Sequence, residues 1–359
     1  MPVYPELAHL SDLLFTTAIA LYTLAVISYC GEYAFGRRGR VARTAAIPAP
    51  RVLVGAGGPD AVDPDVPGSD VPGPDDVAGP SDFAGPADAL TTAADPGAVD
   101  RRANLLGRLA VLLTVVGAAG HLTSIVLRGI SVDRIPWGNM YEFSSAVGFV
   151  AVAAFCVVLF RQPRVRYLGM FVMLPVILLM FLAGTVLYAK AAPLVPALRS
   201  YWLAIHVTSA ILATGIFMVS FVVTVLYLLR ARYDRLAAAG APPARFPMAL
   251  GARLPAAGVL DQIAYRTVAF GFPVWTFGIA AGAMWAEAAW GRYWGWDPKE
   301  TWSFVAWVVY AAYLHARATA GWKGVKAARI NLLGFGAMTF NFFVVNIVVA
   351  GLHSYAGLS

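Results

Sequence analysis

One segment of the sequence concentrates aromatic and charged side chains. Residues 290–302 read WGRYWGWDPKETW, in which four tryptophans and a tyrosine stand among two basic and two acidic residues. Flat aromatic faces suit a large planar ligand, and Arg292 or Lys299 either binds anionic groups on its edge or is paired by the neighbouring carboxylates. The composition favours a flat, amphipathic and anionic guest.

The bland explanation of this segment is an aromatic belt at the membrane surface, where tryptophan and tyrosine settle at the level of the lipid headgroups. It accounts for Trp290 and Trp302, which border apolar stretches. It does not account for Trp294 and Trp296, which are set among charged residues with Pro298 stiffening the backbone. The two inner tryptophans therefore indicate ligand binding.

Histidine is the second residue type that could bind a ligand, and the chain has five. His206, in SYWLAIHVTSA, and His353, in GLHSY, are far apart in the sequence, but each lies near the end of an apolar stretch. Imidazoles from separate helices can hold the iron of a porphyrin from opposite faces. We predict that His206 and His353 form such a metal- or haem-ligating pair, although either one alone could be an interfacial side chain with a polar tip.

The remaining histidines and the cysteines carry weaker signals. His315 and His121 lie within apolar stretches, where an ionisable side chain usually faces a partner or the bundle interior. For each, the alternative to a ligand site is a satisfied polar residue that packs two helices. His9 is expected to be solvated. Cys30 and Cys156 form neither a CxxC nor a pair at metal-ligand spacing, so no thiol or zinc chemistry is expected.

Membrane-spanning helices must position these residues. The 359 residues are 59% hydrophobic with a mean hydropathy of +0.67, outside the usual range of soluble domains. The sequence predicts an all-α, polytopic integral membrane protein with about eight transmembrane helices, since roughly 20 apolar residues cross the hydrocarbon core. No basic leader or small-residue cleavage pattern accompanies the first span, so we predict a retained transmembrane helix and not a signal peptide. The predicted spans are 10–29, 104–127, 142–160, 167–189, 201–229, 261–285, 302–318 and 331–350.

A polar stretch separates the first two spans. Residues 37–100 are rich in proline, glycine, aspartate and alanine, with few large apolar side chains, so they cannot bury enough surface to offset their ordering entropy. We predict a first transmembrane helix within residues 1–36, a disordered cytoplasmic insertion at 37–100, and a seven-helix domain at 101–359. The tryptophan-rich loop of that domain covers 286–302.

The basic residues predict the orientation. With the N-terminus outside, 21 of the 27 lysines and arginines fall in inner loops, the side on which such residues are retained. Both termini are then extracytoplasmic. The tryptophan-rich loop, His353 and the entrance of the helix that carries His206 share the outer face, with His206 about 9 Å below that entrance. The basic residues are spread over short loops and form no nucleic-acid-binding face.

Asparagines predict two further features. Asn139, in RIPWGNMYEF at 134–143, is predicted to cap the third span. The last span combines asparagines with Gly334 and Gly336, a pattern that predicts close helix packing and interhelical hydrogen bonds. The asparagines concerned are Asn331, Asn341 and Asn346.

The tryptophan-rich segment resembles the WWD signature of haem-handling membrane proteins, and its surroundings resemble the CcsA (ResC) branch of System II cytochrome c assembly. The resemblance covers most of the chain from about residue 104 onward. Besides the WWD segment and RIPWGNMYEF, it includes SYWLAIHV at 200–207, LHAR at 314–317 and GLHSY at 351–355. The order of the histidines around the tryptophans favours this branch over the System I relatives.

The resemblance implies roles for individual residues. His206 and His353 correspond to the external axial ligands of haem iron. His315 resembles the transmembrane histidine of a deeper haem site whose partner histidine belongs to another subunit, whereas His121 has no secure counterpart. The residues implied to hold the porphyrin edge are Trp294, Trp296 and Asp297, with the adjoining Trp290 and Trp302.

The resemblance also implies a function. The chain is expected to be the haem-handling subunit of a System II cytochrome c synthetase in the bacterial plasma membrane, half of a holocytochrome c synthase (haem lyase-type) that acts with a ResB/Ccs1-like membrane subunit. Haem b, bound transiently, is expected to pass from the cytoplasmic side to the external site, where the CxxCH thiols of apocytochrome c form thioethers. Because the chain has no outward-facing cysteine, an external thioredoxin-like protein must supply reductant.

Other function classes remain open from the residues. One alternative is a haem exporter without ligation activity, which a measurement of covalent cytochrome maturation distinguishes. Another is a secondary transporter for a small anion, which is expected to place charged residues near mid-membrane. A bis-histidine electron-transfer cytochrome is a third, but it needs no exposed aromatic loop.

Overall fold

The computed structural model describes residues 4–35, 96–193, 200–240, 245–319, 321–349 and 351–352. These residues form α-helices and two short 3-10 helices, η2 (Pro163–Leu168) and η4 (Met248–Arg253), with no strand among them. The all-α prediction is therefore confirmed. The α-helices are α1 (Pro5–Phe35), α3 (Pro96–Ser131), α4 (Met140–Arg161), α5 (Gly169–Thr185), α6 (Tyr201–Ala238), α7 (Ala257–Trp290), α8 (Pro298–Ala318) and α9 (Val325–Ile347).

Each predicted span coincides with one of these helices. Seven helices of the described part are long and apolar enough to cross a membrane, and α8 is not among them. Its 21 residues include Lys299 and Glu300 in the first turn and Arg317 in the last, which shorten its apolar stretch. The chain is a multi-pass membrane protein. The predicted insertion at 37–100 lies almost entirely outside the described residues, and α3 already begins at Pro96.

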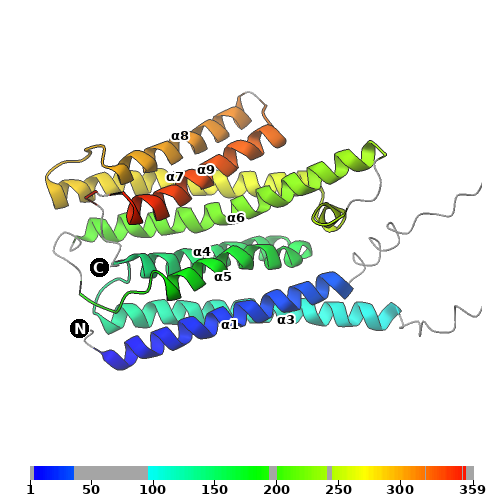
Figure 1. The fold of residues 1–359 in the computed structure, drawn as a ribbon, viewed down its shortest axis with the longest axis horizontal. Helices are drawn as coiled ribbons and strands as arrows, with labels where there is room; N and C mark the ends of the chain where they lie inside the picture. Colours follow the sequence, from blue (N-terminus) through cyan, green and yellow to red (C-terminus); the bar gives the residue numbers. More distant parts are fainter. Residues whose placement is uncertain are drawn as a thin grey trace, which may run out of the picture.

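Successive helices run side by side in opposite directions along the long axis of the molecule (Figure 1). Four neighbouring pairs form the bundle: α1 with α3, α4 with α5, α6 with α7 and α8 with α9, while α6 also packs on α4 and α9. The start of α6, the connection from α7 to α8 and the end of α9 therefore lie at one end of the bundle (Figure 1). The side of the membrane that this end faces stays a prediction.

Local chemistry sets the helix ends at this side. Asn139 precedes α4 in extended conformation, and its side-chain oxygen accepts from the Glu142 backbone N–H at 2.9 Å, which confirms the predicted cap. Ser200 caps α6 in the same way by accepting from Trp202 N at 3.2 Å. The end of α7 is Gly291, whose φ of 70° is left-handed and favours glycine.

Side chains of α6 join the two halves of the bundle. Phe217 of α6 stacks on Tyr310 of α8 with 4.0 Å between ring centroids. On α9, Gly334 faces the same tyrosine ring so closely that a Cβ would lie 2.9 Å from it. Asn331 of α9 donates to Ser220 Oγ of α6 at 2.8 Å, which confirms the predicted interhelical hydrogen bond. The second half of the chain is therefore fixed against α6.

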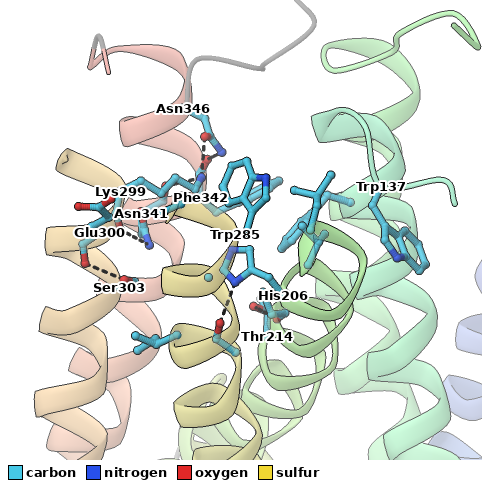
Figure 2. Close-up of a pocket in the computed structure, with 18 of the residues that line it drawn as sticks. Trp137, His206, Thr214, Trp285, Lys299, Glu300, Ser303, Asn341, Phe342 and Asn346 are labelled. Carbon is cyan, nitrogen blue, oxygen red and sulfur yellow. Dashed lines mark hydrogen bonds between the residues drawn. The ribbon is translucent and has the colours of Figure 1, made fainter. Parts of the chain in front are cut away.

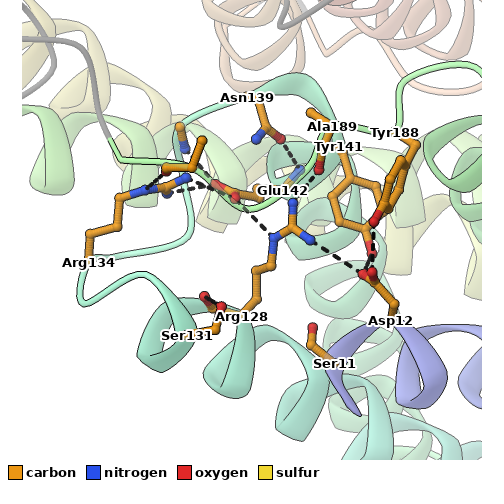
Figure 3. Close-up of polar contacts among 12 residues, drawn as sticks. Ser11, Asp12, Arg128, Ser131, Arg134, Asn139, Tyr141, Glu142, Tyr188 and Ala189 are labelled. Atoms are coloured by element: carbon orange, nitrogen blue, oxygen red, sulfur yellow. Dashed lines mark hydrogen bonds and ion pairs between the residues drawn. The ribbon is translucent and has the colours of Figure 1, made fainter. Parts of the chain in front are cut away.

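A buried ionic cluster of Asp12, Arg128, Arg134 and Glu142 joins α1, α3 and α4 (Figure 3). Glu142 accepts from Arg128 Nε at 3.2 Å and from Arg134 Nη1 at 2.8 Å, and Arg128 Nη1 lies 3.3 Å from Asp12 Oδ1. The Gly138 backbone N–H also donates to Glu142, at 2.8 Å. Every member of the cluster is thus paired with opposite charge.

Candidate functional site

A pocket opens at the end of the bundle that carries the tryptophan-rich loop (Figure 2). Its empty space, the open mouth included, is about 1260 Å³. The walls come from α4, α6, α7 and α9, and the loop before α8 closes one side. The volume and the aromatic lining suit a large organic ligand. Prominent lining side chains are Trp137, Phe143, His206, Trp285, Trp294 and Lys299.

His206 presents one ring nitrogen to this pocket. Its Nδ1 lies 2.8 Å from the carbonyl oxygen of Gly278 on α7. Because a carbonyl oxygen only accepts, Nδ1 carries the proton, and the lone pair of the neutral imidazole is on Nε2. A backbone carbonyl on the far nitrogen is the usual way to orient a histidine that binds a metal.

Close packing of α7 holds the imidazole in place. A Cβ on Gly282 would lie 2.7 Å from His206 Nδ1, so any larger residue would force the ring to shift. Trp285 lies nearly parallel to the imidazole, with 5.9 Å between ring centroids and 12° between planes. The ring is therefore held between a helix backbone and an aromatic wall before any ligand binds.

Glu300, in the first turn of α8, organises the tryptophan-rich loop. Its Oε2 accepts from the backbone N–H groups of Gly295 at 2.8 Å and Asp297 at 3.1 Å, and its Oε1 lies 3.3 Å from Arg292 Nη1. The contact with Asp297 forms part of a capping box that starts α8. A side chain on Gly295 would collide with the Arg292 guanidinium. The Glu300 carboxylate thus holds the loop in this conformation through contacts with three of its residues.

The predicted tryptophans occupy different places. Trp294 lines the pocket. The ring of Trp296 packs edge-to-face with the ring of Trp294, with 5.7 Å between centroids. Trp296 is 66% exposed and has a positive φ of 57°. Trp290 packs on Trp285 at 4.8 Å, and Trp302 packs on Phe340 of α9. Of the four predicted tryptophans, only Trp294 lines the pocket together with His206.

Lys299 is the basic side chain that reaches the pocket. Its Nζ donates to Asn346 Oδ1 at 2.5 Å and lies 3.5 Å from the Asn341 carbonyl oxygen. Asn346 is held in that orientation because its Nδ2 donates to the Phe342 carbonyl at 2.7 Å. Arg292, by contrast, is paired with a carboxylate of α8. Both oxygens that Lys299 contacts are neutral, and the Asp297 carboxylate also acts electrostatically on the ammonium group. The side chain thus offers an ammonium group that can bind an anionic ligand.

Asp297 links the loop to the chain that follows α9. It is only 6% exposed, and burial raises the pKa of its carboxyl group, while backbone N–H groups of Leu352 and Lys299 lower it. A Cβ on Gly351 would lie 2.8 Å from Asp297 Oδ2, so the two segments touch. His353, the next predicted ligand, lies outside the described residues and stays a prediction.

His315 and His121, the two histidines within predicted spans that remain, lie away from the pocket. His315 is exposed in the last turn of α8, about 26 Å along that helix from Pro298. His121 is fully buried, with its Nε2 3.0 Å from Ser145 Oγ and its Nδ1 3.4 Å from the Tyr22 hydroxyl. His121 therefore packs α1, α3 and α4 together, as the alternative for that residue predicts.

Trp285 and Glu300 are the site residues that the sequence analysis missed as such. Trp285 sits within a predicted span, and its only sequence signal is Gly278 and Gly282 one helical turn apart, which marks close approach of another side chain. Glu300 was seen only as a charge near the tryptophans. Its hydrogen bonds to backbone N–H groups of the loop depend on a tight turn that no spacing rule describes.

The sequence matches known proteins over most of its length. A family described as "Cytochrome C assembly protein" matches residues 137–353, which include the pocket residues named above. The "Cytochrome c biogenesis protein CcsA" of Gloeobacter violaceus is 34% identical over 301 residues, covering 71% of this chain and 87% of that protein. The protein of the same description from Guillardia theta is 42% identical over 177 residues, 47% of this chain and 59% of that protein.

A solved structure has a similar fold. The "Cytochrome c Heme Lyase CcmF" superimposes with a TM-score of 0.53 at 14% sequence identity. The likeness covers 98% of this chain but 48% of that one, so this chain spans about half the length of the lyase. At this identity the likeness concerns the fold alone.

Proposed function

Because the chain belongs to the family of CcsA-type cytochrome c assembly proteins, we propose that it is the haem-handling subunit of a System II cytochrome c synthetase. Its role in cytochrome c maturation involves haem, apocytochrome c and partner proteins. The proposal adds that the pocket of His206 holds haem b transiently, on the extracytoplasmic face of a bacterial plasma membrane, and that this bound haem is the one joined to apocytochrome c.

The imidazole of His206 is the observation that carries this proposal. Its Nδ1 proton is engaged by the Gly278 carbonyl, which leaves the Nε2 lone pair for a metal. The surrounding pocket is aromatic and large, so its shape and chemistry fit a porphyrin. His206 is accordingly proposed as one axial ligand of the haem iron.

His353 is proposed as the opposite axial ligand. The chain just before it lies against Asp297, because the Leu352 backbone N–H donates to that carboxylate. Asp297 in turn belongs to the tryptophan-rich loop that closes the pocket. This contact supports a ligand supplied from beyond α9, and two imidazoles would set the potential of the iron.

The remaining residues of the loop are proposed to hold the porphyrin edge. Trp294 offers an aromatic face in the pocket, Trp296 supports it from outside by packing on its ring, and Lys299 offers an ammonium group to the haem propionates. Trp290 and Trp302 act through packing, on Trp285 and on α9 respectively. Asp297 and Glu300 then fix the loop in place.

Covalent attachment requires groups that this chain does not present at the pocket. The thiols of an apocytochrome CxxCH segment add across the haem vinyl groups, and these thiols must be reduced. Cys30 and Cys156 lie toward the opposite ends of α1 and α4. We propose an external thioredoxin-like reductant and a ResB/Ccs1-like second subunit, whose histidine would complete a deeper haem site with His315.

Absorption spectra test the axial pair. The full chain is purified beside His206→Ala and His353→Ala, with His9→Ala as a matched control because His9 is an exposed histidine on α1. The wild type and the control are expected to show a reduced bis-imidazole spectrum that both site variants lose and that added imidazole restores. An unchanged spectrum in either site variant contradicts its role.

Covalent maturation separates the synthetase from a haem exporter. A deletion strain is complemented with the wild type or with His206→Ala, together with the second subunit, and covalent haem in apocytochrome c is measured. The variant is expected to lose almost all maturation, and imidazole is expected to restore part of it. Full maturation by this chain without any ResB-like partner would contradict the two-subunit proposal.

A further inference from the structure

A second cavity lies deeper in the bundle, between α4, α5, α6 and α9. Its empty space, the mouth included, is about 740 Å³, and none of the described residues that line it is charged. On α6 it is lined by Thr214 and Met218, which are two to three turns beyond His206. At 1.5 Å per residue they lie about 12 and 18 Å further from the pocket end of the helix. We refer to this space as the apolar chamber.

The apolar chamber adjoins the His206 pocket. Phe143, Thr214, Met338 and Phe342 line both spaces. The rings of Phe143 on α4 and Phe342 on α9 stack on each other, with 5.1 Å between centroids and 21° between planes. A single aromatic pair from two different helices thus stands where the chamber meets the pocket.

The chamber also has a mouth at the side of the bundle. Two of its lining residues are exposed, Leu178 of α5, at 59%, and Thr339 of α9. α5 packs mainly on α1 and α4, and α9 packs mainly on α6 and α8, so α5 and α9 scarcely touch. Both helices are long and apolar enough to span a membrane. The mouth between them therefore faces hydrocarbon and not water.

Two of the polar groups at the chamber are turned into their own helices, whereas the hydroxyl of Ser144 is buried with no hydrogen-bond partner among the described residues. The hydroxyl of Thr214 donates to the Ala210 carbonyl at 2.7 Å, and that of Thr339 donates to the Phe335 carbonyl at 2.9 Å. Their methyl groups are left to line the space. Such a lining accepts an apolar group readily but strongly disfavours a carboxylate.

We propose that the gap between α5 and α9 is a bilayer-side entrance to the His206 pocket, which a flat amphipathic ligand passes with its apolar edge in the chamber. The inference rests on the proposed function, in which that ligand is haem. The carboxylates of the ligand remain at the level of Lys299, near the end of the bundle, while the apolar edge of the ligand crosses the chamber. The Phe143 and Phe342 rings must part as the ligand moves into the pocket.

Loading from the bilayer tests the entrance. The full chain is reconstituted without haem in phosphatidylcholine vesicles, and haemin is added to the same bilayer. In Leu178→Trp the larger side chain obstructs the mouth. Leu174→Trp is the matched control, because Leu174 is 54% exposed one turn earlier on α5 and does not line the chamber. Two signals are followed: the absorption band of histidine-bound haem and the quenching of tryptophan fluorescence by the porphyrin.

We expect both signals to develop about tenfold more slowly in Leu178→Trp than in the wild type and the control, with the same final spectrum in all three, because an obstructed route changes a rate and not an equilibrium. Equal rates in all three proteins overturn the entrance. If the histidine-bound band never develops in the wild type, the axial pair is wrong, and the quenching rates still decide whether a porphyrin enters between α5 and α9.

Discussion

Two polar regions at the same end of the bundle, the ionic cluster and the His206 pocket, differ in the partners of their buried charged groups. In the ionic cluster, Glu142 is paired with both Arg128 and Arg134, and its side chain is only 1% exposed (Figure 3). In the His206 pocket, Lys299 contacts an amide oxygen and a backbone carbonyl (Figure 2). Both regions bury charge, but the first pairs its charged groups with one another, whereas the hydrogen bonds of Lys299 in the second go to neutral oxygens.

The contrast separates a structural site from a binding site. Buried charges are costly unless opposite charge and hydrogen bonds compensate them. The ionic cluster satisfies that requirement with residues of α1, α3 and α4, so it fixes those helices. In the pocket the ammonium group of Lys299 donates to neutral oxygens and interacts electrostatically with the Asp297 carboxylate, while Glu300 is occupied by Arg292 and the loop backbone. The ammonium group can therefore still bind an anionic ligand. Variants of the two regions should therefore fail differently, the first in stability and the second in binding.

The largest effect is expected from Glu142→Ala. The substitution leaves two arginines facing each other with little compensation and removes the acceptor of the Gly138 N–H. Breaking a buried pair of this kind costs about 3–5 kcal/mol of unfolding free energy. Unfolding in detergent measures it, with Asp234→Ala as control, since Asp234 is 42% exposed in its pair with Arg230. The control is expected to cost below about 1 kcal/mol. Equal losses of unfolding free energy in the two variants would show that the cluster stabilises the fold no more than an exposed ion pair does.

Lys299→Ala is expected to weaken binding without unfolding the chain. Loss of a charge-assisted hydrogen bond costs about 2 kcal/mol, which corresponds to roughly 30-fold weaker affinity for haem. The dimethyl ester of haem lacks the carboxylates, so its affinity is expected to change little. Titrations of both ligands into the purified chain measure the difference. If the ester loses as much affinity as haem, the ammonium group does not bind carboxylate.

Gly282→Ala tests the fit of the imidazole. The added methyl group would lie 2.7 Å from His206 Nδ1 and must displace the ring. We expect about 1.5 kcal/mol of lost haem affinity, close to tenfold. Gly336→Ala is the control: contrary to the close packing predicted from the sequence, Gly336 is exposed, and a Cβ there meets nothing within 4 Å among the described residues. Identical haem titrations for the two variants would show that the glycine does not set the ring position.

The smallest effect is expected from Asn139→Ala, which removes the α4 cap beside the ionic cluster. The lost hydrogen bond to Glu142 N costs about 1 kcal/mol of stability. Asn139→Asp keeps an acceptor at the cap and is expected to retain most of it. Unfolding midpoints in detergent measure both. A loss as large as that of Glu142→Ala would mean that the cap and the cluster act as one unit.

Hydropathy and residue type predict a large part of the architecture. Eight apolar stretches locate the eight helices, because a membrane span must be long and apolar whatever it packs against. The Asn139 cap and the Asn331 hydrogen bond also follow from local patterns. The helix α8 lies where the stretch 302–318 predicts it, although it is not among the seven described helices that are long and apolar enough to cross a membrane.

The site is less predictable, because side-chain partners depend on tertiary contacts. The sequence analysis left Arg292 and Lys299 as equivalent candidates for an anionic ligand. Their difference comes from Glu300, which pairs with Arg292, and from Asn346, which belongs to a helix more than forty residues further along the chain. The role of Trp285 beside His206 likewise depends on how α6 and α7 cross. Spacing along the chain does not encode such choices.

The loop that Glu300 holds in place affects how fast a ligand can bind and leave. Since a single carboxylate fixes the backbone of Gly295 and Asp297 before a guest arrives, the guest has little chain to order when it docks. Neither docking nor departure then requires the loop to fold or unfold. That behaviour suits a carrier that must surrender its cargo in every cycle better than one that stores it.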